Sequence, residues 1–166
     1  MRQWFIPALL GALILAACDR APDTEKFLTT AATAGQFEIE ASRIAASKAT
    51  HQDVKAFAGQ MISDHESAAQ RLSSAAIESG RMPPPAGLDD RQKRKLEELR
   101  LSSGQDFDKL YVEQQLEAHD EAVALFSDYT KSNGDDGPIG RFAKETLPTL
   151  EAHLSHVRGL KATPIT

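Results

Sequence analysis

The 166-residue chain is poor in cysteine and aromatic residues, and it has no excess of positive charge. Its single Cys excludes an internal disulfide and any zinc site built from several thiolates. Aromatic residues make up 6% of the sequence and Val is scarce beside abundant Ala, a balance that favours helix over sheet. Nineteen basic against twenty-four acidic residues give a net charge of -5, which argues against nucleic-acid binding. The sequence also contains no Gly-rich phosphate loop, no serine nucleophile elbow and no pair of catalytic carboxylates.

The first 17 residues have the pattern of a secretory signal. An arginine at position 2 precedes an uncharged apolar run over residues 4–15, which is shorter than the roughly 20 residues needed to span a bilayer. The run ends in Leu15-Ala16-Ala17-Cys18, which resembles the bacterial lipobox. That resemblance implies cleavage before Cys18 and acylation of this residue. Plain cleavage after Ala17 and an uncleaved anchor are the alternatives.

We therefore expect lipid on Cys18 to hold the mature protein on a membrane, with residues 18–23 as a short tether. The expected location is the periplasmic side of the cell envelope. Asp19 resembles an inner-membrane retention signal of enterobacterial lipoproteins, but other lineages read this position differently. Either the inner or the outer membrane therefore fits.

Residues 24–161 are expected to form a single helical domain, followed by a tail over 162–166. Apolar residues recur every three or four positions within 24–49, 54–79, 105–131 and 138–160, as in amphipathic helices. Thr50 and Asp53 resemble a capping box at the start of the second helix. Pro148 is expected to kink the last helix or to divide it.

Three consecutive prolines at 83–85 end the second helix, and a short polar helix is expected over 89–101. The turns near residue 50 and at 132–137 would make two antiparallel hairpins, joined by the proline-rich link. The predicted fold class is therefore all-α: an up-down four-helix bundle with a short extra helix between the second and third long helices.

Four polar residues occupy apolar stripes, one on each long helix: Glu38, His65, His119 and His153. Counted along the helical rise, Glu38 and His119 lie roughly 18 Å before the ends of their helices, at residues 50 and 131. His65 and His153 lie roughly 22 Å after the corresponding turns. If both hairpin turns lie at one end of the bundle, all four side chains meet in one layer.

A carboxylate and three imidazoles can hold one divalent ion in tetrahedral or five-coordinate geometry, and zinc, manganese, iron, copper and nickel all suit these ligands. A hydrogen-bonded network with water is the alternative way to satisfy four such buried groups. Asp64, next to His65, is read either as a partner that orients a ligand or as a solvated residue.

Other polar and aromatic residues are weaker candidates for the site. We expect His51 to be solvated in a turn, and His156 to be exposed, with the edge of the site as its alternative. Met61 lies on an apolar stripe and is expected in the core, although its thioether would suit copper. Tyr111 and Tyr129 are expected to pack at the edge of the bundle.

Several segments resemble a bacterial ferritin-like family called domain of unknown function 4142, over a span from about Phe27 to Leu160. The most specific are Met61-Ile62-Ser63-Asp64-His65 and Leu147-Pro148-Thr149-Leu150-Glu151-Ala152-His153. The resemblance implies a ferritin-like bundle exported to the cell envelope, without an established reaction. The family's recurring polar positions match Glu38, Asp64, His65, His119 and His153.

Ferritin-like di-iron proteins carry Glu-x-x-His on two helices. Here Ile62, Leu116 and Leu150 stand three residues before the three histidines, so a single-metal site is expected. The function predicted from the sequence is an exported, lipid-anchored domain that binds one divalent transition metal in the bundle core, for metal handling or protection against oxidative or envelope stress. A metal-free interaction or scaffold domain and a metal-dependent oxidoreductase are the alternatives. Protein partners and oligomeric state stay open.

Overall fold

The computed structural model describes residues 24–133 and 137–162, so the predicted signal, Cys18, the tether and residues 163–166 of the predicted tail lie outside the described residues, while residue 162 ends the last helix. The described residues are all-helical, with no strand among them. None of the described helices is long and apolar enough to cross a membrane. The helices are α1 (Thr24–Lys48), α2 (Gln52–Glu78), α3 (Asp90–Leu101), α4 (Gly104–Asn133) and α5 (Pro138–Ala162).

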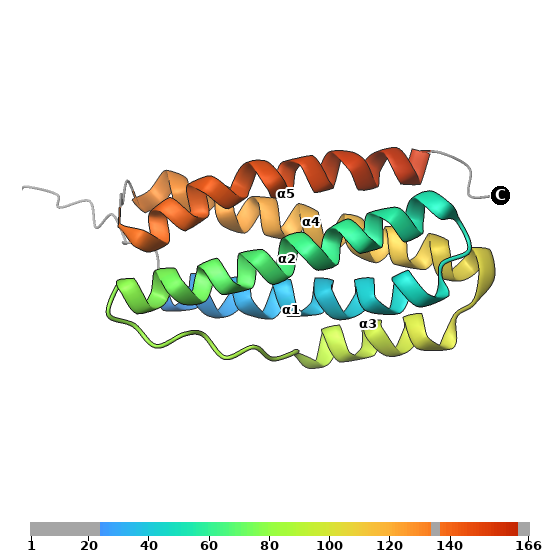
Figure 1. Ribbon diagram of the computed structural model, residues 1–166, viewed down its shortest axis with the longest axis horizontal. Helices are drawn as coiled ribbons and strands as arrows, with labels where there is room; N and C mark the ends of the chain where they lie inside the picture. Colours follow the sequence, from blue (N-terminus) through green and yellow to red (C-terminus); the bar gives the residue numbers. More distant parts are fainter. Residues whose placement is uncertain (1–23, 134–136, 163–166) are drawn as a thin grey trace, which may run out of the picture.

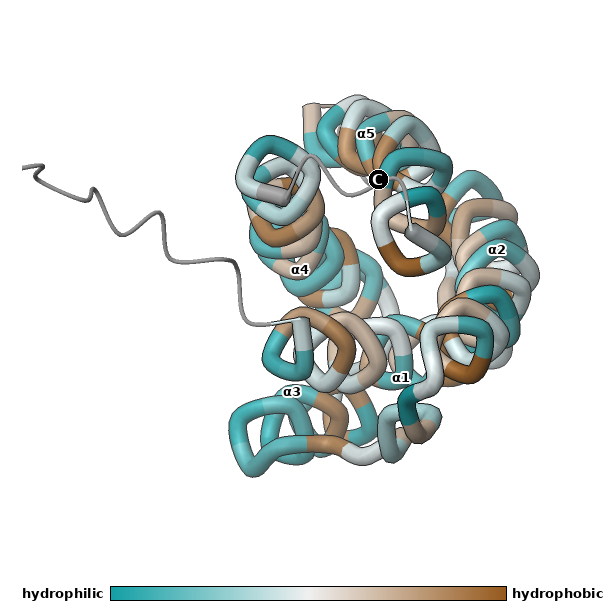
Figure 2. Tube along the Cα trace, turned by 90° about the vertical axis from the view of Figure 1, so that its left-hand side faces the viewer, coloured by the Kyte–Doolittle hydropathy of each residue, from teal (hydrophilic) through white to brown (hydrophobic). Residues whose placement is uncertain are grey.

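The four long helices form a four-helix bundle, as predicted. Around the bundle, α1 packs against α2, α2 against α5, α5 against α4, and α4 against α1. The short helix α3 lies outside this ring, against α1 and α4 (Figure 2). The apolar stripes of the long helices thus face a shared interior, which is what the three-and-four spacing of the sequence requires.

The α1–α2 turn and the α4–α5 turn lie at opposite ends of the bundle. The prediction that the four polar residues lie in one layer assumed that both turns lie at one end. Thr50, in the α1–α2 turn, is hydrogen-bonded to Asp108 near the start of α4. Tyr129, near the end of α4, stacks on Phe27 near the start of α1. The link that contains α3 therefore runs along the bundle, and α2 and α4 point in the same direction (Figure 1).

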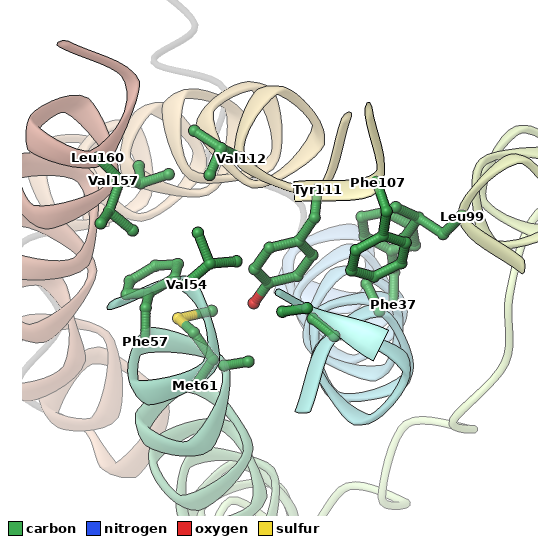
Figure 3. Packing of buried hydrophobic residues seen from close by; sticks show 14 of the residues in the cluster. Phe37, Val54, Phe57, Met61, Leu99, Phe107, Tyr111, Val112, Val157 and Leu160 are labelled. Atoms are coloured by element: carbon green, nitrogen blue, oxygen red, sulfur yellow. The ribbon is translucent and has the colours of Figure 1, made fainter. Parts of the chain in front are cut away.

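Two apolar clusters fill the bundle, one toward each end. The first contains Phe57, Phe107 and Tyr111 (Figure 3), and the second contains Phe27 and Phe126. Tyr111, expected at the bundle edge, is instead fully buried. Its hydroxyl forms a hydrogen bond of 2.9 Å with Ser42, which is how a buried phenol keeps a polar partner.

Tyr129 is also buried rather than at the bundle edge. Its ring lies parallel to that of Phe27, with the ring centroids 3.9 Å apart. The expectation that both tyrosines lie at the bundle edge is wrong. The apolar pattern of a single helix indicates the direction of a side chain but not which other helix covers it. Here α1 covers the rings that α4 presents.

The helix ends differ from the sequence prediction in two places. The N-cap of α2 is His51, whose Nδ1 accepts a hydrogen bond from the Asp53 N–H at 3.3 Å, so the capping box at Thr50 is wrong. The helix α5 is continuous through Pro148, so its division is wrong too. A proline there removes one backbone donor, and Pro148 itself is exposed, so its ring displaces no core residue.

The turn between α1 and α2 is held by a buried carboxylate. Asp108 is fully buried and accepts from Thr50 N–H at 3.0 Å and from His51 N–H at 2.8 Å. The Thr50 hydroxyl donates to the same carboxylate. Asp108 thereby fixes the α1–α2 turn to the first turns of α4, and the register of these three helices follows.

We predict that Asp108→Ala lowers the free energy of unfolding by about 2 kcal/mol, because three partly buried donors in the α1–α2 turn lose a charged acceptor. Urea denaturation monitored by circular dichroism measures the change. The matched control is Asp106→Ala, in the same turn but exposed, which should cost about 1 kcal/mol or less. Equal losses in the two variants would contradict this role for Asp108.

Candidate metal centre

Three histidines from three helices meet inside the bundle. His65 belongs to α2, His119 to α4 and His153 to α5, and each is at most 5% exposed. One ring nitrogen from each residue lies within 4.8 Å of those from the other two. The ring centroids are 5.4 to 5.7 Å apart. Imidazole nitrogens at this spacing are close enough to share one metal ion.

The histidines share one level because each lies near the middle of its helix. They stand 13 to 15 residues after the first residue of α2, α4 and α5, which is roughly 20 Å along each axis. A residue near the middle of a helix is about equally far from both ends of the helix, so its level along the bundle does not depend on which way the helix runs. The predicted convergence is therefore correct for the histidines, although the two turns lie at opposite ends.

The hydrogen bonds of two rings fix where their protons lie. His119 Nδ1 is 2.9 Å from the backbone carbonyl oxygen of Gln115, which can only accept, so Nδ1 donates and Nε2 keeps a free lone pair. His153 Nε2 is 2.9 Å from Asp64 Oδ2, so Nε2 donates and Nδ1 keeps the lone pair. Each ring thus presents one unprotonated nitrogen.

Glu38, predicted as a ligand, contacts the other side of two of these rings. Its Oε2 lies 3.2 Å from His65 Nδ1, and its Oε1 lies 3.3 Å from His119 Nδ1. The group of ring nitrogens within 4.8 Å consists of the three histidines without Glu38. In this arrangement the carboxyl group is placed to orient two imidazoles, as carboxylates do behind metal-bound histidines.

The nitrogens that remain have no hydrogen-bond partner among the described residues. They are Nε2 of His65, Nε2 of His119 and Nδ1 of His153, and all three are buried. A buried polar atom without a partner costs free energy, of the order of 1–3 kcal/mol each. Three rings that each keep one unpartnered nitrogen, in a cluster with one nitrogen per ring within 4.8 Å, can bind a metal ion.

Burial favours the uncharged forms of His65, His119 and Glu38. It lowers the pKa of His65 to about 3, with the neighbouring His119 and His153 adding to the effect. It lowers the pKa of His119 to about 4, against the hydrogen bond to Gln115, which raises it. It raises the pKa of Glu38 to about 8. Neutral imidazoles are the form that binds metals.

Asp64 lies against His153 of the neighbouring helix, not against His65 beside it in the sequence. Its side chain is 37% exposed, so it joins the buried ring to the surface. His156 is exposed and packs its ring on Phe57, with the ring centroids 4.9 Å apart. Met61 is fully buried in the core, as expected.

Sequence reasoning missed Gln115, which lies one helical turn before His119. Its carbonyl orients that ring, and its side chain is fully buried with neither amide atom hydrogen-bonded within the described structure. The available signal was its position on the apolar stripe of α4, four residues from both Tyr111 and His119. A second missed residue is Asp108, the acceptor for the α1–α2 turn.

Comparison with known proteins identifies one family. The model of the family described as "Domain of unknown function (DUF4142)" matches residues 15–160. No curated protein sequence matches the chain significantly.

Solved structures share the fold at low sequence identity. A DUF305 fragment from Deinococcus radiodurans has a TM-score of 0.72 at 11% identity, covering 84% of this chain and 95% of the fragment. CopM in its Cu(II)-bound form has a TM-score of 0.70 at 18% identity, covering 82% and 94%. Its Ag-bound form has a TM-score of 0.68 at 19% identity, covering 82% and 93%. At these identities the similarity establishes the helical-bundle fold.

We predict different tautomers for two of the clustered histidines in the metal-free protein. His119 should carry its proton on Nδ1 and His153 on Nε2, because their acceptors fix these positions. Long-range proton–nitrogen correlation spectra at about pH 6 would distinguish the two, and His119 should remain neutral there because its pKa lies near 4. The same tautomer in both rings would contradict the structure.

Proposed function

We propose that this chain, which belongs to the DUF4142 family, binds one transition-metal ion through His65, His119 and His153 in the core of its bundle. The observation that carries the proposal is a cluster of three buried imidazoles, each with one unpartnered nitrogen, in which one nitrogen per ring lies within 4.8 Å of the others. The three unpartnered nitrogens have no hydrogen-bond partner among the described residues.

The surroundings of the three rings fit a bound ion. Glu38, Asp64 and the Gln115 carbonyl each lie against one nitrogen of a ring and leave the other nitrogen of that ring without a partner in the described residues. Such acceptors fix ring orientation and strengthen imidazole as a ligand. Three protein ligands leave a further coordination position for water or another small ligand. We therefore assign Glu38 the orienting role in place of the ligand role that the sequence suggested.

Copper is the ion to test first, with zinc as its competitor. Three neutral imidazoles favour late first-row metals, and divalent copper binds most tightly in that series. CopM, which shares this fold, is solved in Cu(II)-bound and Ag-bound forms, and this supports metal handling as the role of the bundle.

We predict that the protein, purified without a polyhistidine tag, takes up one equivalent of Cu(II), or of Zn(II) when copper is withheld. Binding should raise the melting temperature, because the ion binds only the folded state. His119→Gln should lower the affinity at least about a hundredfold, since one of three ligands is lost. Titration against a chromophoric chelator measures the affinity, and melting curves measure the stabilisation.

The matched control is His156→Gln, which removes an exposed histidine three residues from His153 and should leave the affinity unchanged. Circular dichroism checks that both variants are folded. If the unsubstituted protein binds no ion, or if His156→Gln weakens binding as much as His119→Gln does, the cluster is not the site. The scaffold function without metal would then be the better explanation of the bundle.

We also propose that a lipid on Cys18 holds the domain on the periplasmic side of the cell envelope, in metal handling or stress protection. The lipobox-like Leu15-Ala16-Ala17-Cys18 supports this assignment. Residues 18–23 would connect the lipid to the first turn of α1.

Cys18→Ser should release the protein from the membrane fraction, because the thiol that accepts the diacylglyceryl group is removed. Cell fractionation and labelling with a fatty-acid analogue measure this, and Ser132→Ala at the end of α4 is the control that keeps the label. Full membrane association of Cys18→Ser would contradict lipid anchoring.

A further inference from the structure

A cavity of about 240 Å³ lies beside the histidine cluster, on the side away from the α1–α2 turn. Alanines of α1 and α2 form its outer walls, and Phe126, Phe142 and Leu150 of α4 and α5 line its interior. Pro84 and Ala86, in the link between α2 and α3, lie along its edge. In Figure 1 the green link that follows α2 runs along α1 on its way to α3.

Small residues border the cavity on two helices: Ala34 and Gly35 on α1, and Ala68 and Ala69 on α2. Toward the α1–α2 turn, the same two helices contribute Phe37, Phe57 and Met61 to the core. Leaving such space lowers the stability of a core, in proportion to the volume left empty. A buried apolar cavity of roughly 150 Å³ is already large enough to take up benzene.

One end of the cavity is polar. Glu38 and His65 line it, and Glu38 Oε1 and His65 Nε2 have no hydrogen-bond partner in the described part of the chain. Thr146 supplies a further hydroxyl, which accepts from Arg71 at 3.2 Å. No Lys or Arg is among the described residues that line the cavity, and the nearby Arg71 already donates to Thr146, so an anion inside would lose its hydration against mostly apolar walls. A cation would lose its hydration against apolar walls.

We infer that this cavity is a binding site for a small uncharged molecule: a ring or short hydrocarbon chain among the alanines and phenylalanines, with one hydroxyl group directed to Glu38 and His65. The site adjoins the histidine cluster, shares His65 with it, and needs no metal ion. It takes molecules of about the size of benzyl alcohol, because the walls enclose little more than one aromatic ring.

The probe is benzyl alcohol, titrated into the metal-free protein while amide resonances are followed by NMR. Shifts should be confined to residues of the cavity, such as Ala34, Ala68 and Leu72. Benzoate and benzylamine, which have the same size but carry a charge at neutral pH, should bind about tenfold more weakly or worse. Tighter binding of either charged compound would overturn the inference.

Ala68→Phe places a ring in the cavity and should weaken benzyl alcohol binding at least about tenfold. Ala56→Phe adds the same ring on an exposed position of α2, outside the cavity, and should leave binding unchanged. Ala34→Leu fills the cavity from α1 and serves if Ala68→Phe does not fold. Equal binding in the filled and control variants, or no binding to the unsubstituted protein, would overturn the inference.

Copper uptake by Ala68→Phe separates this inference from the proposed metal site. The variant keeps His65, His119 and His153, so one equivalent of Cu(II) should still bind. Loss of benzyl alcohol binding with copper uptake retained places the molecule in the cavity. If the unsubstituted protein binds copper but not benzyl alcohol, the cavity assignment fails and the metal site stands.

Discussion

Two hydrogen bonds that hold protons on the outward nitrogens of His119 and His153 determine what the centre of this bundle can do. The backbone carbonyl of Gln115 and the carboxylate of Asp64 can only accept, so each ring must turn an unprotonated nitrogen inward. With those acceptors absent, either ring could adopt the other tautomer and pair locally. The acceptors therefore create the convergent lone pairs, and they come from a helix's own backbone and from a neighbouring helix.

The packing on either side keeps the three rings at one level. An apolar cluster around Phe57 and Tyr111 fills the bundle toward the α1–α2 turn, and another around Phe27 and Phe126 fills the opposite end. Asp108 adds a polar constraint, since it ties the α1–α2 turn to α4. A shift of any helix by one residue would rotate its histidine by about 100° about the helix axis and away from the cluster. Close packing that prevents such a shift is therefore needed for the site to form.

The sequence was sufficient to predict the bundle and the residues at its centre, because periodicity and polar residues on apolar stripes are local features. The end of the bundle at which the α4–α5 turn lies was not predictable. The link over residues 79–89 has no periodicity that would indicate whether it runs along the bundle or stays at one end. The prediction that the histidines lie at one level is still correct, because each lies near the middle of its helix and its depth is similar from either end. The role of Glu38 depends on which ring atom it meets, and side-chain conformations are not encoded in spacing.

The histidine centre and the cavity share Glu38 and His65, and this makes them dependent on each other. A molecule that contacts these two side chains acts on the orientation of a metal-binding ring, and an ion on that ring acts on the polar end of the cavity. By thermodynamic linkage, any factor by which the molecule changes the affinity for the ion is also the factor by which the ion changes the affinity for the molecule. Small residues at Ala34 and Ala68 lower the stability of the bundle, yet they leave space next to the site. A core selected only for stability would fill that space with larger apolar side chains.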